Sequence, residues 1–78
     1  MRVIDLLDSV AWDFDLEDLH LVETDHCGND QLIGQYDISN GNYDTVPYDA
    51  RCLKVLSWKV IPYKNGDIGL YFDLMIWV

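Results

Sequence analysis

The stretch RCLKVLSWKVIPYKNGDIGLYFDLMIWV, residues 51 to 78, holds most of the apolar mass of the chain and decides the predicted fold. Two segments rich in β-branched and aromatic residues flank the dipeptide Asn65-Gly66. Such a dipeptide between two apolar segments is typical of a β-hairpin turn. We therefore predict that the chain ends in a long hairpin.

Proline decides the predicted register of this hairpin. A two-residue turn at Asn65-Gly66 would place Pro62 opposite Gly69, at a hydrogen-bonded position where proline has no N–H to donate. A three-residue loop, Lys64-Asn65-Gly66, with Gly66 in a left-handed bulge, instead places Pro62 opposite Ile68 at a non-hydrogen-bonded position. We favour the second register.

The two faces of the predicted hairpin differ in polarity, because side chains alternate along a strand. The first face is nearly all apolar and is predicted to be core; it carries Leu56, Trp58, Val60, Ile68, Leu70, Phe72, Leu74 and Ile76. The second face pairs Lys59 with Tyr71 and Ser57 with Asp73, but it becomes apolar at the open end of the hairpin. That end carries Leu53 opposite Trp77, and Val55 near Met75. This apolar patch needs a cover, which could be the Trp12–Phe14 segment, a partner or a second copy of the chain.

Length and composition indicate one domain, residues 1–78, since half of the 78 residues are hydrophobic and the chain is too short for two cores. No apolar run is long enough to span a bilayer, and the N-terminal MRVIDLLD has acids where a signal peptide needs an apolar region. We expect a soluble cytoplasmic protein with no membrane contact. A lone pair of cysteines in such a chain is expected to stay reduced.

The charge is strongly one-sided, with fourteen acidic and five basic residues giving a net charge of −9. This balance disfavours direct binding to nucleic acid or to an anionic membrane. It favours a basic protein partner, such as a nuclease or another nucleic-acid enzyme. The alternative is that the acidity only maintains solubility.

Periodicity predicts the remaining elements. Val3, Leu6, Leu7 and Val10 recur at helical spacing and predict a short amphipathic helix over residues 3 to 10. Alternation predicts strands over Leu19–Thr24 and Leu32–Ile38, which the turn-rich Asp25–Asp30 joins into a hairpin. One helical turn is expected after Pro47. The predicted fold class is α+β, with a short N-terminal helix packed on a four-stranded antiparallel sheet made of two hairpins.

Acidic residues alternate with apolar ones between the predicted helix and the first strand, at Asp13, Asp15, Glu17 and Asp18. They could be solvated charges beside buried aromatic side chains. They could instead imitate the phosphates of a nucleic-acid backbone in the basic groove of a partner. Calcium binding is a third interpretation, although the chain lacks the EF-hand loop pattern.

Two histidines and two cysteines could in principle complete a tetrahedral zinc site, made of His20, His26, Cys27 and Cys52. The chain lacks the Cys-x-x-Cys spacing that identifies such sites. The alternative is two small apolar thiols and two surface imidazoles. Zinc is therefore one candidate cofactor, and the other expectation is that no cofactor is needed.

Catalytic patterns are missing from the sequence. Cys27 lies beside His26, but neighbours in a strand or turn rarely point the same way, and no third orienting group can be named. The serines have no motif around them. We therefore predict that the protein is not an enzyme.

Several segments resemble the layout of short acidic proteins encoded by phages and mobile elements of Gram-positive bacteria. These segments are VIDLL at residues 3–7, GQYD at 34–37, VPY at 46–48 and LKVLSW at 53–58. That group includes anti-CRISPR proteins, which inhibit a type II effector nuclease. The resemblance implies a phage protein acting in the cytoplasm of a host bacterial cell, with no catalytic residues.

Charge and resemblance together predict a non-enzymatic inhibitor that binds a basic host protein, such as a type II CRISPR nuclease, and blocks its engagement with nucleic acid. The predicted partner-binding residues are the four acids Asp13, Asp15, Glu17 and Asp18 and the apolar patch of Leu53, Val55, Met75 and Trp77. One alternative is an immunity or antitoxin protein that neutralises a basic toxin. Another is a small structural module stabilised by zinc.

Overall fold

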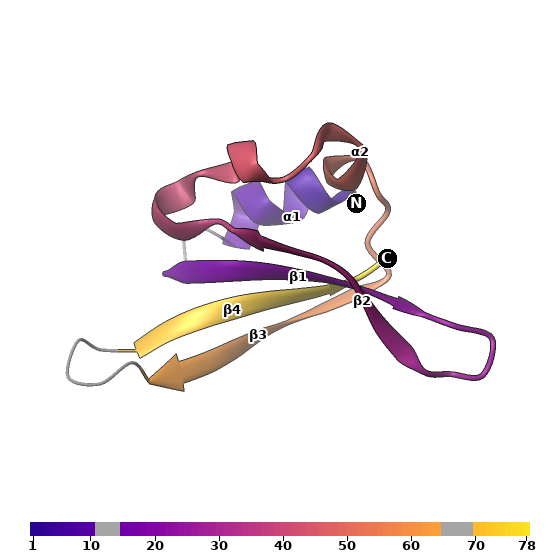
Figure 1. Cartoon of the computed structure of the whole chain (residues 1–78). Helices are drawn as coiled ribbons and strands as arrows, with labels where there is room; N and C mark the ends of the chain where they lie inside the picture. Colours follow the sequence, from indigo (N-terminus) through magenta and orange to yellow (C-terminus); the bar gives the residue numbers. More distant parts are fainter. Residues whose placement is uncertain (11–14, 65–69) are drawn as a thin grey trace.

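The computed structural model describes residues 1–10, 15–64 and 70–78, which form one mixed β-sheet with its helices on one side (Figure 1). The elements follow in the order α1 Val3–Val10, β1 Leu16–Thr24, β2 Asp30–Asp37, η1 Ser39–Gly41, η2 Tyr43–Thr45, α2 Tyr48–Arg51, β3 Ser57–Lys64 and β4 Leu70–Trp77. The predicted α+β class with a short N-terminal helix is confirmed. No helix in the described ranges has the length and apolarity needed to cross a bilayer.

Helix α1 has the bounds and the orientation that its periodicity predicts. The four apolar residues at helical spacing, Val3, Leu6, Leu7 and Val10, are all buried, while Ile4 is partly buried and the two aspartates are exposed. The carboxylate of Asp5 accepts a hydrogen bond of 3.0 Å from the backbone N–H of Arg2 at the start of the helix. This contact satisfies a donor that the helix leaves without an internal partner.

The sheet is mixed, so the prediction of a purely antiparallel sheet is wrong. The strand order is β2-β1-β4-β3, with antiparallel pairing of β1 to β2 and of β3 to β4. The two inner strands, β1 and β4, run parallel. The segment between β2 and β3 passes over the helical side of the sheet, which allows β4 to pair with β1 (Figure 1).

Polarity explains why β1 and β4 are the inner strands. An inner strand has neighbours on both edges and buries more of its side chains than an edge strand. Leu19, Leu21, Leu74 and Ile76 are almost inaccessible, at 0 or 1% exposed. The outer strands are more polar, and β3 carries Lys59 and Pro62, residue types that protect an exposed edge against further pairing.

The register between β3 and β4 differs from the predicted one. Pro62 pairs with Phe72 rather than with Ile68, and Lys59 pairs with Met75 rather than with Tyr71, a shift of four residues (75 − 71). The prediction considered only the turn, whereas β4 must also stay in register with β1 on its other edge. The proposed loop residues Asn65 and Gly66 lie outside the described residues, as does Ile68.

A shift by an even number leaves each side chain on its predicted face, yet only part of the predicted core is buried. Leu74 and Ile76 are fully buried, and Val60 and Phe72 pack partly buried against the core. Leu56 and Trp58 were predicted to be core but are 71% and 44% exposed. Leu56 precedes the edge strand β3 and Trp58 lies on it, and an edge strand has a neighbouring strand on one side only, which explains the error.

We call the side of the sheet without helices the open face. Alternation and pairing place on it Asp18, His20 and Val22 of β1, Gln35 of β2, Lys59 of β3, and Asp73, Met75 and Trp77 of β4. Val22 is only 3% exposed but does not belong to the cluster around α1. The open face is therefore partly apolar and partly acidic.

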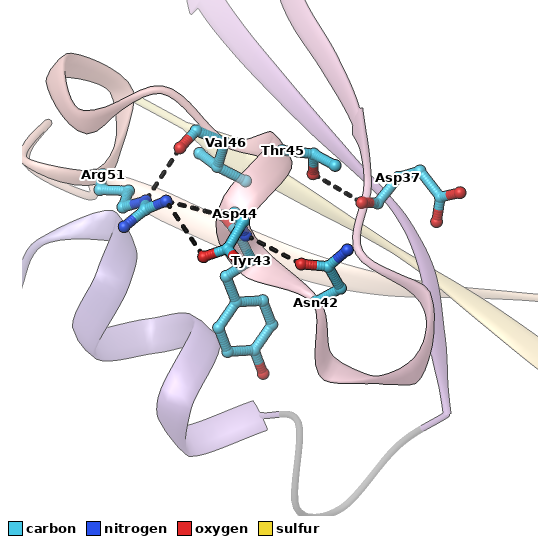
Figure 2. Close-up of polar contacts among 7 residues, drawn as sticks. All are labelled: Asp37, Asn42, Tyr43, Asp44, Thr45, Val46 and Arg51. Atoms are coloured by element: carbon cyan, nitrogen blue, oxygen red, sulfur yellow. Dashed lines mark hydrogen bonds and ion pairs between the residues drawn. The ribbon is translucent and has the colours of Figure 1, made fainter.

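Arg51 holds together the segment that joins β2 to β3 (Figure 2). Its guanidinium group donates hydrogen bonds to the carbonyl oxygens of Val46, at 2.8 Å, and Tyr43, at 3.1 Å. Arg51 belongs to α2, the helical turn that was predicted after Pro47 and is confirmed. The Val46 carbonyl thereby gains a partner, while the Tyr43 carbonyl, which also accepts from the Val46 N–H at 3.0 Å, gains a second one.

Candidate functional site

The acidic residues predicted to bind a partner do not form one continuous row. Leu16 pairs with Phe72, and Leu19 pairs with Leu74. Between these two pairs β1 has two residues, Glu17 and Asp18, whereas β4 has only Asp73. This irregularity interrupts the alternation on which the prediction depended. Asp13 and the Trp12–Phe14 segment lie outside the described residues.

The other three acids lie in two different places. Asp15 and Glu17 line an open cavity of about 500 Å³ together with Ile38 and Tyr43. Asp18 instead lies on the open face, where it neighbours His20 and Asp73. A single extended imitation of a phosphate backbone therefore finds no geometric support in the described acids.

The predicted apolar patch is also divided. Val55 packs partly buried against the core, and its N–H donates to the carbonyl of Met1 at 2.9 Å. Met75 and Trp77 are partly buried on the open face, where the Lys59 ammonium lies 5.5 Å from the centroid of a Trp77 ring. Trp77 pairs with Ser57, so the expected pairing of Leu53 with Trp77 is wrong.

Leu53 contributes instead to a different surface, which we call the apolar hollow. It is a shallow depression of about 330 Å³, lined by Glu23, Ile33, Leu53, Lys54, Leu56 and Val78. Ile33, Leu53 and Leu56 are 46%, 37% and 71% exposed. Three exposed aliphatic side chains gathered at one end of the sheet make this hollow the main candidate for partner contact.

Sequence reasoning missed Ile33 because alternation in β2 breaks at that residue. Leu21 pairs with Gly34 and Val22 with Leu32, so Ile33 has no opposite residue. A residue in such a bulge leaves the regular alternation of faces. The sequence did contain a signal, because Leu32 and Ile33 are adjacent and strict alternation cannot place both side chains on one buried face. In the structure both are exposed.

Several basic side chains are already engaged within the protein. Arg2 lies 3.6 Å from the carboxylate of Asp5, Arg51 binds backbone carbonyls, and Lys59 stacks over Trp77. With a net charge of −9, the field outside the protein attracts cationic surfaces.

Among the described residues, three carboxyl groups have lowered pKa values, and each has a local structural cause. The backbone N–H of Asn29 lowers the pKa of Asp25, and the backbone N–H of Arg2 lowers that of Asp5. Hydrogen bonds from Ser39 lower the pKa of Asp37. These carboxylates stabilise turns and a helix start, so their pKa shifts do not identify a reactive group.

The four predicted zinc ligands are not brought together. His26 and Cys27 are exposed in the turn between β1 and β2, Cys52 follows α2, and His20 lies on the open face. Within the described ranges, the one group whose potential ligand atoms all lie within 4.8 Å of one another consists of Asp18, His20 and Asp73. Sequence reasoning missed Asp73 as a ligand, although it is the single charged residue of β4.

Compared with protein-family models, with curated proteins and with solved structures, the chain gives no significant match. The resemblance to phage-encoded anti-CRISPR proteins stays a prediction.

Proposed function

We propose that this protein is a non-enzymatic inhibitor that binds a basic, nucleic-acid-processing host protein and competes with nucleic acid for its surface. The observation that carries the proposal is the apolar hollow, in which Ile33, Leu53 and Leu56 are exposed on a chain of net charge −9. Stable protein interfaces combine an apolar centre with a polar rim.

Charge and apolar contact would have separate roles in this binding. The negative field accelerates encounter with a basic surface and weakens as salt screens it. Leu56 and Ile33 would lose contact with water in the complex and limit dissociation. Glu23 at the edge of the hollow offers a carboxylate to a lysine or arginine of the partner.

A type II CRISPR nuclease is the specific target class that we propose, since the resemblance and the negative charge both favour it. The test is DNA cleavage by purified type II nucleases over a series of inhibitor and salt concentrations. We expect inhibition that weakens as salt rises, and a Leu56→Asp variant at least about tenfold weaker, because it places an unpaired charge in the apolar contact.

Two controls separate specific binding from general attraction between opposite charges. Tyr48→Asp adds the same single charge at a 75% exposed position outside the hollow and should inhibit as well as the parent protein. Lysozyme, an unrelated basic protein, should not bind at physiological salt. If neither substitution changes inhibition, the apolar hollow is not the binding surface. If no tested nuclease is inhibited, the result counts against this target class.

A further inference from the structure

We infer that Asp18, His20 and Asp73 form a binding site for a divalent transition-metal cation, with Zn²⁺ as its best-fitting ion. The three side chains extend from the two inner strands onto the open face, and one potential ligand atom of each lies within 4.8 Å of the others. The site shares only His20 with the zinc set predicted from the sequence. It does not depend on the proposed inhibitory function.

The distance between His20 and Asp73 fits shared coordination better than a direct hydrogen bond. The His20 Nε2 and Asp73 Oδ2 atoms are 3.4 Å apart, which is long for an N–H···O bond. Two ligands at ordinary zinc bond lengths and a tetrahedral angle would be separated by about 3.3 Å. The two strands therefore hold these atoms at nearly the spacing that one zinc ion requires.

An unsatisfied oxygen gives independent support. The second carboxylate oxygen of Asp73, Oδ1, is buried and has no hydrogen-bond partner in the described part of the chain. The whole side chain is 23% exposed, and that of His20 is 22% exposed. Because an unpaired buried carboxylate oxygen is costly, a bound cation that the carboxylate could share would remove an unfavourable feature of the metal-free protein.

The third ligand lies beside a residue of a neighbouring strand. The Gln35 side-chain nitrogen of β2 is 3.5 Å from Asp18 Oδ2, which is also long for a hydrogen bond, so it leaves Asp18 free to turn toward a cation. The donors are one imidazole nitrogen and two carboxylates, a mixed set that suits zinc better than calcium or magnesium, which favour oxygen ligands alone.

The proposed ion would join parts of the chain that are far apart in sequence. His20 and Asp73 are separated by 53 positions and lie on the parallel strands β1 and β4. Coordination by both strands would resist their separation, so zinc should stabilise the native state. Three protein ligands also leave a fourth position for water or for a side chain of a partner.

The test is calorimetric titration of the full chain with zinc chloride after removal of metal, together with thermal unfolding with and without zinc. We expect one saturable site and a higher melting temperature in zinc. Asp73→Asn and His20→Gln should each weaken zinc binding about tenfold or more and remove the thermal effect. Cobalt in place of zinc should give no thiolate charge-transfer band, because the site contains no cysteine.

Matched variants keep the result interpretable. Glu23→Gln removes one negative charge from the same strand without touching the cluster, and it should bind zinc like the parent protein. The combined variant His26→Gln, Cys27→Ser and Cys52→Ser should do the same. If Asp73→Asn unfolds by circular dichroism, Asp18→Asn provides the same test. No saturable binding, or binding that depends on the cysteines rather than on Asp18 and Asp73, would overturn the proposal.

Discussion

The phenol oxygen of Tyr43 donates a hydrogen bond to the carbonyl oxygen of Leu7, at a distance of 3.1 Å. Leu7 is among the last four residues of α1, whose carbonyl groups have no partner within the helix. Burial, with the charge of Asp8 nearby, raises the pKa of Tyr43 above its ordinary value of 10.0. This hydrogen bond links η2 to the last turn of α1.

Tyr43→Phe should therefore lower the free energy of unfolding by about 1 kcal/mol, the usual net value of one hydrogen bond. Urea denaturation followed by tryptophan fluorescence measures this loss. Tyr48→Phe is the matched control, because Tyr48 is 75% exposed and should change stability by less than about 0.5 kcal/mol. Equal effects of the two substitutions would contradict the assigned role of Tyr43.

Two leucines on the predicted core face should respond very differently to the same truncation. Leu74→Ala should cost about 2–5 kcal/mol, since Leu74 is 0% exposed and its loss leaves a cavity under α1. Leu56→Ala should cost less than about 0.5 kcal/mol, since Leu56 is 71% exposed. Urea denaturation of both variants checks the pair, and a large loss for Leu56→Ala would show that the hollow is covered in the isolated protein.

Arg51→Lys should destabilise the protein by about 1–2 kcal/mol, although it keeps the charge. A lysine cannot reproduce the planar arrangement in which Nε donates to Val46 and Nη2 to Tyr43. Arg2→Lys is the control, because the Arg2–Asp5 ion pair is exposed and such pairs contribute little. Chemical denaturation compares them, and equal stability of the two variants would show that the guanidinium contacts do not stabilise the segment.

The turn between β1 and β2 should report the ionisation of Asp25. Its carboxylate accepts hydrogen bonds from the N–H groups of Asn29 and Cys27, at 2.9 and 2.8 Å, and the first of these is the main cause of its lowered pKa. Because the pKa of Asp25 is lower in the folded than in the unfolded protein, its ionised carboxylate stabilises the folded state. This stabilisation is fully present above the ordinary pKa of 3.8 and is lost as the pH falls through the lower pKa of the folded protein.

An NMR titration of the two amide groups tests this. The amide proton shifts of Asn29 and Cys27 should change together with a midpoint below pH 3.8. Asp25→Asn, which keeps an oxygen acceptor without a charge, should abolish that step. A midpoint at or above 3.8 would show that the turn does not stabilise the carboxylate.

Local periodicity predicted the first helix and the strands, but it did not predict how the strands assemble into one sheet. The spacing of Val3, Leu6, Leu7 and Val10 predicts α1 correctly, since a helix of that length must bury one side. The pairing of β1 with β4 depends on contacts between residues more than fifty positions apart, as in Leu21 with Ile76. No local pattern encodes that pairing.

The residues of the candidate sites, too, could be predicted from the sequence only in part. The hollow could be predicted only through Leu53, because the bulge that turns Ile33 outward and the exposure of Leu56 depend on the sheet around them. Asp18 and His20 are both prominent in the sequence, but their neighbour Asp73 joins them only because β1 and β4 are parallel partners.

The sequence by itself determined the α+β class, the buried side of α1 and the strongly negative charge, because these follow from composition and from short-range periodicity. Only the tertiary structure decided the mixed strand order, the four-residue shift of Pro62 to Phe72 and the meeting of His20 with Asp73. The physical reason is that an inner strand must satisfy hydrogen bonds and packing on both edges at once. The register of β4 must therefore fit both β1 and β3, and the turn between β3 and β4 does not set it alone.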